Sequence, residues 1–166
     1  MASSVFNKAI LILIVCFSAV YGAAQPVFTP NKTDKYNIQI DARGSHLSGM
    51  LIARPTNDGP RTVVASYIGP TLFDYTLTAD SLRVNSSAAP LRRKKLEQLL
   101  DNDLRIVFID ESRAKLTSQT ATTRKRKSGH LFGKTVVLIN TDANQNIETV
   151  TIKHPLIRLK LTINRL

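Results

Sequence analysis

The residues of this chain that could perform acid–base or metal chemistry are few and scattered. Its three histidines, His46, His130 and His154, fall in different predicted strands or turns, and no two of them have the spacing of metal ligands. The single cysteine, Cys16, lies in an apolar N-terminal run and cannot join them. The sequence therefore predicts no metal site and no cofactor.

Two acidic clusters lack the partners that chemistry would require. Asp101, Asn102 and Asp103 resemble the start of a calcium-binding loop, but the glycine and the distal glutamate of such a loop are missing. Asp110 and Glu111 are adjacent, so in a strand they would point to opposite faces rather than act as an acid–base pair. No phosphate-binding glycine loop or Gly-x-Ser-x-Gly elbow is present. We expect a binding protein rather than an enzyme, although catalytic groups from distant strands would leave no local motif.

The chain is strongly basic, with 23 Lys and Arg residues against 12 Asp and Glu residues and a formal net charge of +11. Such a charge favours anionic membrane surfaces, polyanionic glycans or acidic proteins as partners. Nucleic acid is a less favoured partner, because the chain has no Trp and no basic residues interleaved with stacking aromatic residues.

The positive charge is concentrated in two clusters. The clusters are Arg92, Arg93, Lys94 and Lys95, then Arg124, Lys125, Arg126 and Lys127. The first cluster lies at the start of a predicted helix, where cations oppose the helix dipole, so local helix stability does not explain it. The second is predicted to form a turn before Leu131 and Phe132. Each cluster is either a contact with an anionic surface or a solvated face without a partner.

The N-terminal segment has the features of a secretory signal peptide. Lys8 precedes an apolar run that ends in small residues, and this pattern predicts removal of residues 1–24 by cleavage before Gln25. We therefore expect the protein to be exported. If the source is a Gram-negative bacterium, its location would be the periplasm or the outer membrane surface. Residues 25–34 carry prolines without periodicity and are predicted to form a flexible tether. Residues 35–166 form one domain, whose lack of cysteine makes an ordinary hydrophobic core necessary.

Most of this domain has the alternating pattern of half-buried strands. Tyr36, Ile38 and Ile40 alternate with polar residues, for example. Further strands are predicted at 47–53, 62–67, 72–78, 82–85, 104–108, 115–123, 131–140, 147–154 and 157–163. Gly49 marks a bulge or a close approach of backbone. Short strands separated by turns indicate a meandering antiparallel sheet.

A single stretch has helical spacing instead. Pro90 suits a first helical position, and Leu96, Leu99 and Leu100 fall on one face. Near Asn102 the pattern changes to that of a strand. We therefore predict a mainly β (α+β) fold in which a curved antiparallel sheet, or incomplete barrel, wraps one principal helix.

Three segments carry a resemblance to a known family. They are SGMLIARPTNDGPRTVVASYIGPTLFDYTLTADSLRVN, PLRRKKLEQLLDNDLRIVF and IETVTIKHPLIRLKLTINRL. Their order of strands and helix resembles that of small exported proteins of Bacteroidetes type and of lipoprotein-localisation factors (LolA/LolB-like), in which an incomplete barrel wraps helices and cups an acyl chain. The resemblance implies a lipid or acylated protein as ligand. It transfers no functional residue, and the anchor cysteine of the lipid-anchored receptors is missing.

The resemblance directs attention to the apolar residues of the predicted concave face. The predicted ligand-binding residues are Val63, Tyr67, Phe73, Tyr75, Leu96, Leu99, Leu100, Ile157, Leu159 and Leu161. In a filled domain the same residues would simply form the core. Two functions stay open. One is a non-catalytic, carrier-like protein of the cell envelope that binds lipid or lipoprotein. The other is a ligandless structural or protein-interaction domain that binds an anionic envelope partner.

Overall fold

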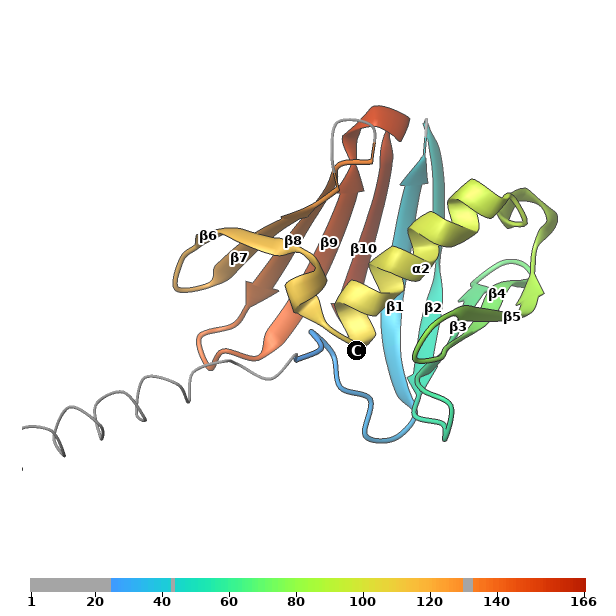
Figure 1. Cartoon of the computed structure of the whole chain (residues 1–166), viewed down its shortest axis with the longest axis horizontal. Coiled ribbons are helices and arrows are strands. Elements are labelled where there is room, and N and C mark those ends of the chain that lie inside the picture. The colour runs from blue at the N-terminus through green and yellow to red at the C-terminus, as the bar shows by residue number, and fades with distance from the viewer. Residues whose placement is uncertain (1–24, 43, 130–132) are drawn as a thin grey trace, which may run out of the picture.

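The chain folds into one antiparallel sheet of ten strands (Figure 1). The computed structural model describes residues 25–42, 44–129 and 133–166; the predicted signal peptide and the segment 130–132 lie outside this range. The strands are β1 (Asp34–Ala42), β2 (Ser45–Arg54), β3 (Arg61–Ser66), β4 (Thr71–Leu77), β5 (Leu82–Ser87), β6 (Lys115–Gln119), β7 (Thr123–Ser128), β8 (Thr135–Thr141), β9 (Ile147–His154) and β10 (Leu159–Arg165).

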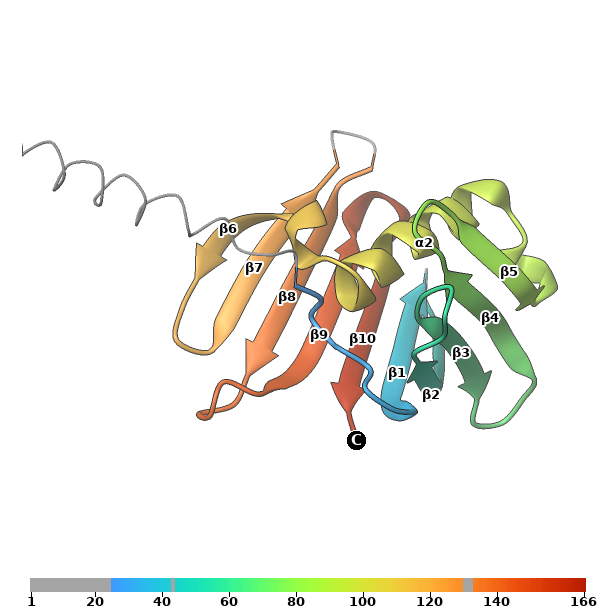
Figure 2. The ribbon, with the colours of Figure 1, turned by 60° about the horizontal axis from the view of Figure 1, so that its bottom comes forward.

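The sheet consists of two five-stranded meanders joined at its centre. Its order is β5-β4-β3-β2-β1-β10-β9-β8-β7-β6, so β1 pairs with β10 and the edges are β5 and β6. The chain from β5 to β6 must therefore cross the whole sheet. It does so through helix α2 (Lys94–Phe108), around which the sheet curves (Figures 1 and 2). The predicted fold class, a curved antiparallel sheet wrapping one principal helix, is confirmed.

The bounds of the helix differ from the prediction. Pro90 belongs to a separate short 3₁₀ helix, η1 (Ala89–Leu91), and α2 begins only at Lys94. The predicted strand 104–108 is wrong, because these residues continue the helix to Phe108. Leu100, Leu104 and Val107 are buried at spacings of four and three residues. This burial outweighs the small cost of β-branched residues in a helix.

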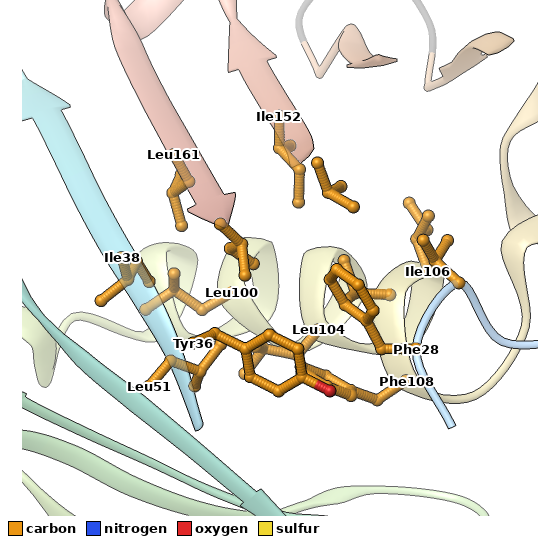
Figure 3. Packing of buried hydrophobic residues seen from close by; sticks show 14 of the residues in the cluster. Phe28, Tyr36, Ile38, Leu51, Leu100, Leu104, Ile106, Phe108, Ile152 and Leu161 are labelled. Carbon is orange, nitrogen blue, oxygen red and sulfur yellow. The ribbon is translucent and has the colours of Figure 1, made fainter. Parts of the chain in front are cut away.

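The core lies between α2 and the concave face of the sheet. Alternate residues of the central strands point toward the helix, among them Ile38 in β1 and Leu161 in β10 (Figure 3). Val27 and Phe28 also belong to this core, although the sequence analysis indicated only a tether for residues 25–34. The backbone N–H of Phe28 donates to the carbonyl of Val107 at 2.9 Å, which holds this segment against the end of α2.

Two local predictions about the second meander need correction. The predicted turn Arg124–Lys127 is part of strand β7, since it pairs with both β6 and β8. Ile157 does not begin the last strand but ends a short 3₁₀ helix, η3 (Pro155–Ile157), which follows from the proline that precedes it. The predicted edge strand near Lys115 is confirmed as β6.

Candidate functional site

Most of the predicted ligand-binding residues lie together between the sheet and the helix. Phe73, Tyr75, Leu100, Leu159 and Leu161 are buried in one cluster, against which Leu96 and Leu99 pack half-buried. The rings of Phe73 and Tyr75 stack with their centroids 4.5 Å apart. Burial raises the pKa of the Tyr75 hydroxyl, and the nearby charge of Glu97 acts in the same direction. The first turns of α2 therefore lie close to β4.

Three residues of the predicted set lie elsewhere. Val63 alternates with the buried Thr62 and Val64, so its side chain is on the convex face. Tyr67 is exposed, and its hydroxyl donates to Asn37, a convex-face residue of β1. Ile157 is exposed in η3. The residues predicted to face the helix were correct in β4 and β10. In β3 the prediction was shifted by one residue, so it selected the opposite face.

The concave face is filled rather than hollow in this state. The surface pockets in the described part of the chain include three formed at loops and strand ends, and none of these three is lined by a residue of α2 or by Phe73 and Tyr75. The side chains of α2 occupy the space in which a ligand would have to lie. Binding on this face would therefore require displacement of part of the helix.

The helix is fastened to one half of the sheet by a buried hydrogen bond. Asp103 Oδ2 lies 2.7 Å from His154 Nε2 at the end of β9, and the His154 Nδ1 lies 3.2 Å from the Thr135 hydroxyl. Asp103 and His154 are only 1% and 4% exposed. Burial raises the pKa of Asp103, more than the bond to His154 lowers it.

A second buried side chain fastens the helix to the other half. Arg105 Nη1 donates to the carbonyls of Thr78 and Ala79, at 3.0 and 3.3 Å, in the turn between β4 and β5. Its Nε donates to Asp101 at 2.7 Å within the helix. Asp103 and Arg105 thus join α2 to both meanders, and both lie in its C-terminal half.

The N-terminal half of α2 has no comparable fastening. Arg93 occupies the N-cap position, but no side chain caps the helix there. Within the described ranges, no side chain from Lys94 to Leu100 forms a hydrogen bond with the sheet. This half is held by apolar contacts of the half-buried Leu96 and Leu99 and the buried Leu100. Cations at the positive end of the helix dipole weaken it further. This half therefore lacks the buried polar contacts that hold the C-terminal half.

The two basic clusters differ in their surroundings. Arg92, Arg93, Lys94 and Lys95 are all exposed at the N-terminal end of α2, where Arg92 Nε also donates to the carbonyl of Ser87 at 2.8 Å. In β7, by contrast, Arg124 and Arg126 donate to one oxygen of Glu111, at 3.0 and 2.7 Å. These two arginines face inward and are held by an intramolecular ion pair, whereas Lys125 and Lys127 alternate onto the opposite face.

The sequence analysis missed four polar residues that fix the helix and its C-terminal connection: Asp103, Arg105, Glu111 and His154. A signal for Asp103 was present. It follows Leu96 by seven residues and Leu100 by three, so it continues the apolar stripe of the helix. A charged residue on such a stripe indicates a buried polar contact. Nothing in the local sequence identifies its partner, which is 51 residues away.

The described ranges lack two further kinds of feature, a metal-binding cluster and a membrane-spanning helix. No group of three or more His, Cys, Asp or Glu side chains in the described ranges could hold a metal ion. Helices long and apolar enough to span a membrane do not occur in the same ranges.

Comparisons with known proteins give a distant structural similarity only. Neither the family models nor the curated proteins contain a match. Among solved structures, the chain is similar to a DUF1329 family protein from Desulfovibrio piger ATCC 29098, with 8% sequence identity and a TM-score of 0.34. The similarity covers 81% of this chain and 84% of the other.

Proposed function

We propose that this is an exported, non-catalytic binding protein that takes up the acyl chain of a lipid or lipidated protein under the N-terminal half of helix α2. The observation that carries the proposal is the uneven fastening of the helix. Asp103 and Arg105 hold its C-terminal half to both meanders. Leu96, Leu99 and Leu100 hold the other half by apolar contacts alone.

An acyl chain can replace the contacts that a displaced helix half would lose. The surface beneath it includes the stacked rings of Phe73 and Tyr75. Exposing such surface to water costs about 25 cal/mol per Å². A bound acyl chain removes most of that cost, so displacement becomes favourable only when the ligand is present.

The exposed basic cluster at the same end of the helix supports a membrane source for this ligand. Arg92, Arg93, Lys94 and Lys95 surround the end of α2 that would move. Each cation close to an anionic membrane contributes about 1 kcal/mol of attraction. Contact with anionic head groups would also relieve the repulsion between these cations and the helix dipole.

Native mass spectrometry with lipid extraction tests the proposal. The protein is produced from the full chain in an exporting cell and purified without detergent. We expect a stoichiometric lipid or acyl species, and its loss in a Leu96→Gln/Leu99→Gln variant. The matched control is Ile68→Gln/Leu156→Gln, which changes two exposed apolar residues outside the core. This control should retain the ligand.

A second candidate function is favoured by the filled concave face. In that case the domain has no internal ligand and acts as a protein-interaction module for an anionic envelope partner. An apo mass, with no uptake of added palmitate or phosphatidylglycerol by the folded protein, would contradict the carrier proposal and support this one.

A further inference from the structure

Four lysines lie in one line across the sheet. In the strand register, Lys115 pairs with Lys127, Lys127 with Val136, Val136 with Lys153, and Lys153 with Lys160. We call Lys115, Lys127, Lys153 and Lys160 the lysine row. It crosses all five strands from β6 to β10, and it could not be recognised in the sequence because its members are up to 45 residues apart.

The lysine row is on the convex face, away from α2. Lys153 lies between the buried Ile152 and His154 along β9, and Lys160 lies between the buried Leu159 and Leu161 along β10. Because side chains alternate along a strand, both lysines point outward. Residues paired across neighbouring strands share a face, so Lys115 and Lys127 point the same way.

Acidic residues do not balance this charge. Strands β6 to β10 contain eight Lys and Arg residues and a single acidic residue, Glu148. Glu148 is the unpaired residue at the irregularity of β9, five positions along the strand from Lys153. Among the described residues, Asp41 alone pairs with the row, 3.4 Å from Lys160.

Two cations of the other meander have acidic partners. Arg61 pairs with Asp74 on the convex face, and Arg83 pairs with Asp58. Like charges that lie directly opposite each other in a sheet are destabilising. The lysine row contains two such pairs, Lys115 with Lys127 and Lys153 with Lys160, so folding stability does not account for it.

We propose that the lysine row binds a linear polyanion, specifically a polysaccharide that carries carboxylate or sulfate groups. The row spans four strand spacings, or about 19 Å, which matches several consecutive sugar residues of an extended chain. Lys125, one pleat away on the same face, adds a fifth cation beside it. Charge complementarity along a line is the feature that such a polymer recognises.

The shape and composition of this face favour a polymer over other anionic partners. The row follows the direction in which the sheet curves around α2 (Figure 2), so a flat membrane would meet only part of it, whereas a flexible chain can follow it. Between the lysines lie Val136, Leu138 and Thr151 rather than aromatic residues. Single-stranded nucleic acid would use aromatic rings for stacking.

The experiment compares binding of dextran sulfate, polygalacturonate and vesicles containing phosphatidylglycerol by the protein made from the full chain. The test variant replaces Lys115, Lys127, Lys153 and Lys160 by Gln. The control replaces Lys32, Lys35, Arg54 and Arg113 by Gln, which removes the same charge from exposed positions outside both the lysine row and the cluster at the start of α2. We expect the test variant to lose at least about tenfold in affinity for a polysaccharide and to show a shallower salt dependence, because fewer counterions are released. The control should lose less than threefold.

Each other outcome overturns the proposal. Equal losses in both variants would mean that net charge alone governs binding. A loss confined to vesicles would mean that the convex face meets a membrane. A test variant with unchanged affinity for both polymers would leave the lysine row without this role. Circular dichroism and thermal unfolding of both variants exclude misfolding as a cause, and we expect the test variant to unfold at a temperature no lower than the parent protein.

Discussion

Asp103 and His154 form a hydrogen bond between helix α2 and strand β9 in the interior of the molecule, with Oδ2 and Nε2 2.7 Å apart. The two residues are 51 positions apart in the chain. Because Thr135 binds the other ring nitrogen, the imidazole links the helix to two strands, β8 and β9. This linkage fixes the C-terminal half of α2 and leaves its N-terminal half to apolar contacts.

The buried carboxyl group of Asp103 predicts a specific pH dependence. Its pKa is raised in the folded state, so between the unfolded and folded pKa values the folded state binds more protons than the unfolded state. The free energy of unfolding therefore falls as the pH rises through this window, which begins near pH 4. Asp103→Asn should remove this fall while keeping a hydrogen-bonding partner for His154.

Urea unfolding at a series of pH values measures the effect as the difference between parent and Asp103→Asn. A carboxyl group whose pKa is lowered in the folded state has the opposite effect on the pH dependence of stability. The Arg61 guanidinium holds the pKa of Asp74 below its usual value, and this effect raises stability with pH in both proteins. The contribution of Asp74 therefore cancels when the free energies of unfolding of the two proteins are subtracted. Parallel curves for the two proteins would show that Asp103 does not titrate in this way.

Arg105 makes the second fastening of α2, and its removal should destabilise the fold. Arg105→Ala leaves the carbonyls of Thr78 and Ala79 without their donor and removes a buried pair with Asp101. We expect a loss of about 2–4 kcal/mol in the free energy of unfolding. The control is Arg83→Ala, which breaks an exposed pair with Asp58 and should cost under about 1 kcal/mol. Similar losses in both variants would contradict a special role for Arg105.

The fold was predictable from the sequence because alternation is a local property. In β1 and β10, and from Phe73 onward in β4, each apolar residue is followed by a polar one, and this pattern alone identifies a half-buried strand. The helix end was not predictable in the same way. Ile106 and Val107 have a high intrinsic preference for strands. They are helical here because the helix buries their side chains against the sheet.

The candidate site was predictable only in part for a related reason. Phe73 and Tyr75 were found because they alternate within one strand. The hydrogen bonds that hold the helix join residues far apart in the sequence, so no local pattern indicates them. In β3 the predicted alternation was shifted by one residue, so Val63 was assigned to the concave instead of the convex face. The row of lysines on the convex face depends on the register of five strands, which local patterns do not determine.

Gly49 shows how closely β2 and β3 approach each other. A Cβ added at this position would lie 2.2 Å from the backbone oxygen of Ala65, next to the irregularity between Val64 and Ala65. Because the obstacle is backbone, Gly49→Ala should cost about 1–3 kcal/mol of stability. Gly133→Ala is the control, since nothing lies within 4 Å of its added Cβ. Thermal unfolding of both variants checks this; a stable Gly49→Ala would mean that the strands can separate at little cost.

Glu111 holds the connection between α2 and β6 against β7. One of its carboxylate oxygens accepts from Arg124 and Arg126, and Arg126 also donates to the carbonyl of Ala114. Arg126 and Glu111 side chains are each only 13% exposed. Glu111→Ala would leave two neighbouring arginines without their shared counter-charge, and we expect a loss of about 1–3 kcal/mol in the free energy of unfolding.

The matched control for Glu111 is Glu148→Ala, which removes an exposed carboxylate from β9 and should change stability by less than about 0.5 kcal/mol. The two arginines provide a further check. In an Arg124→Gln/Arg126→Gln background, Glu111→Ala should cost much less than in the parent protein, because the partners that its carboxylate neutralises are gone. An undiminished cost in that background would show that Glu111 acts through the backbone of η2 (Glu111–Arg113) rather than through β7.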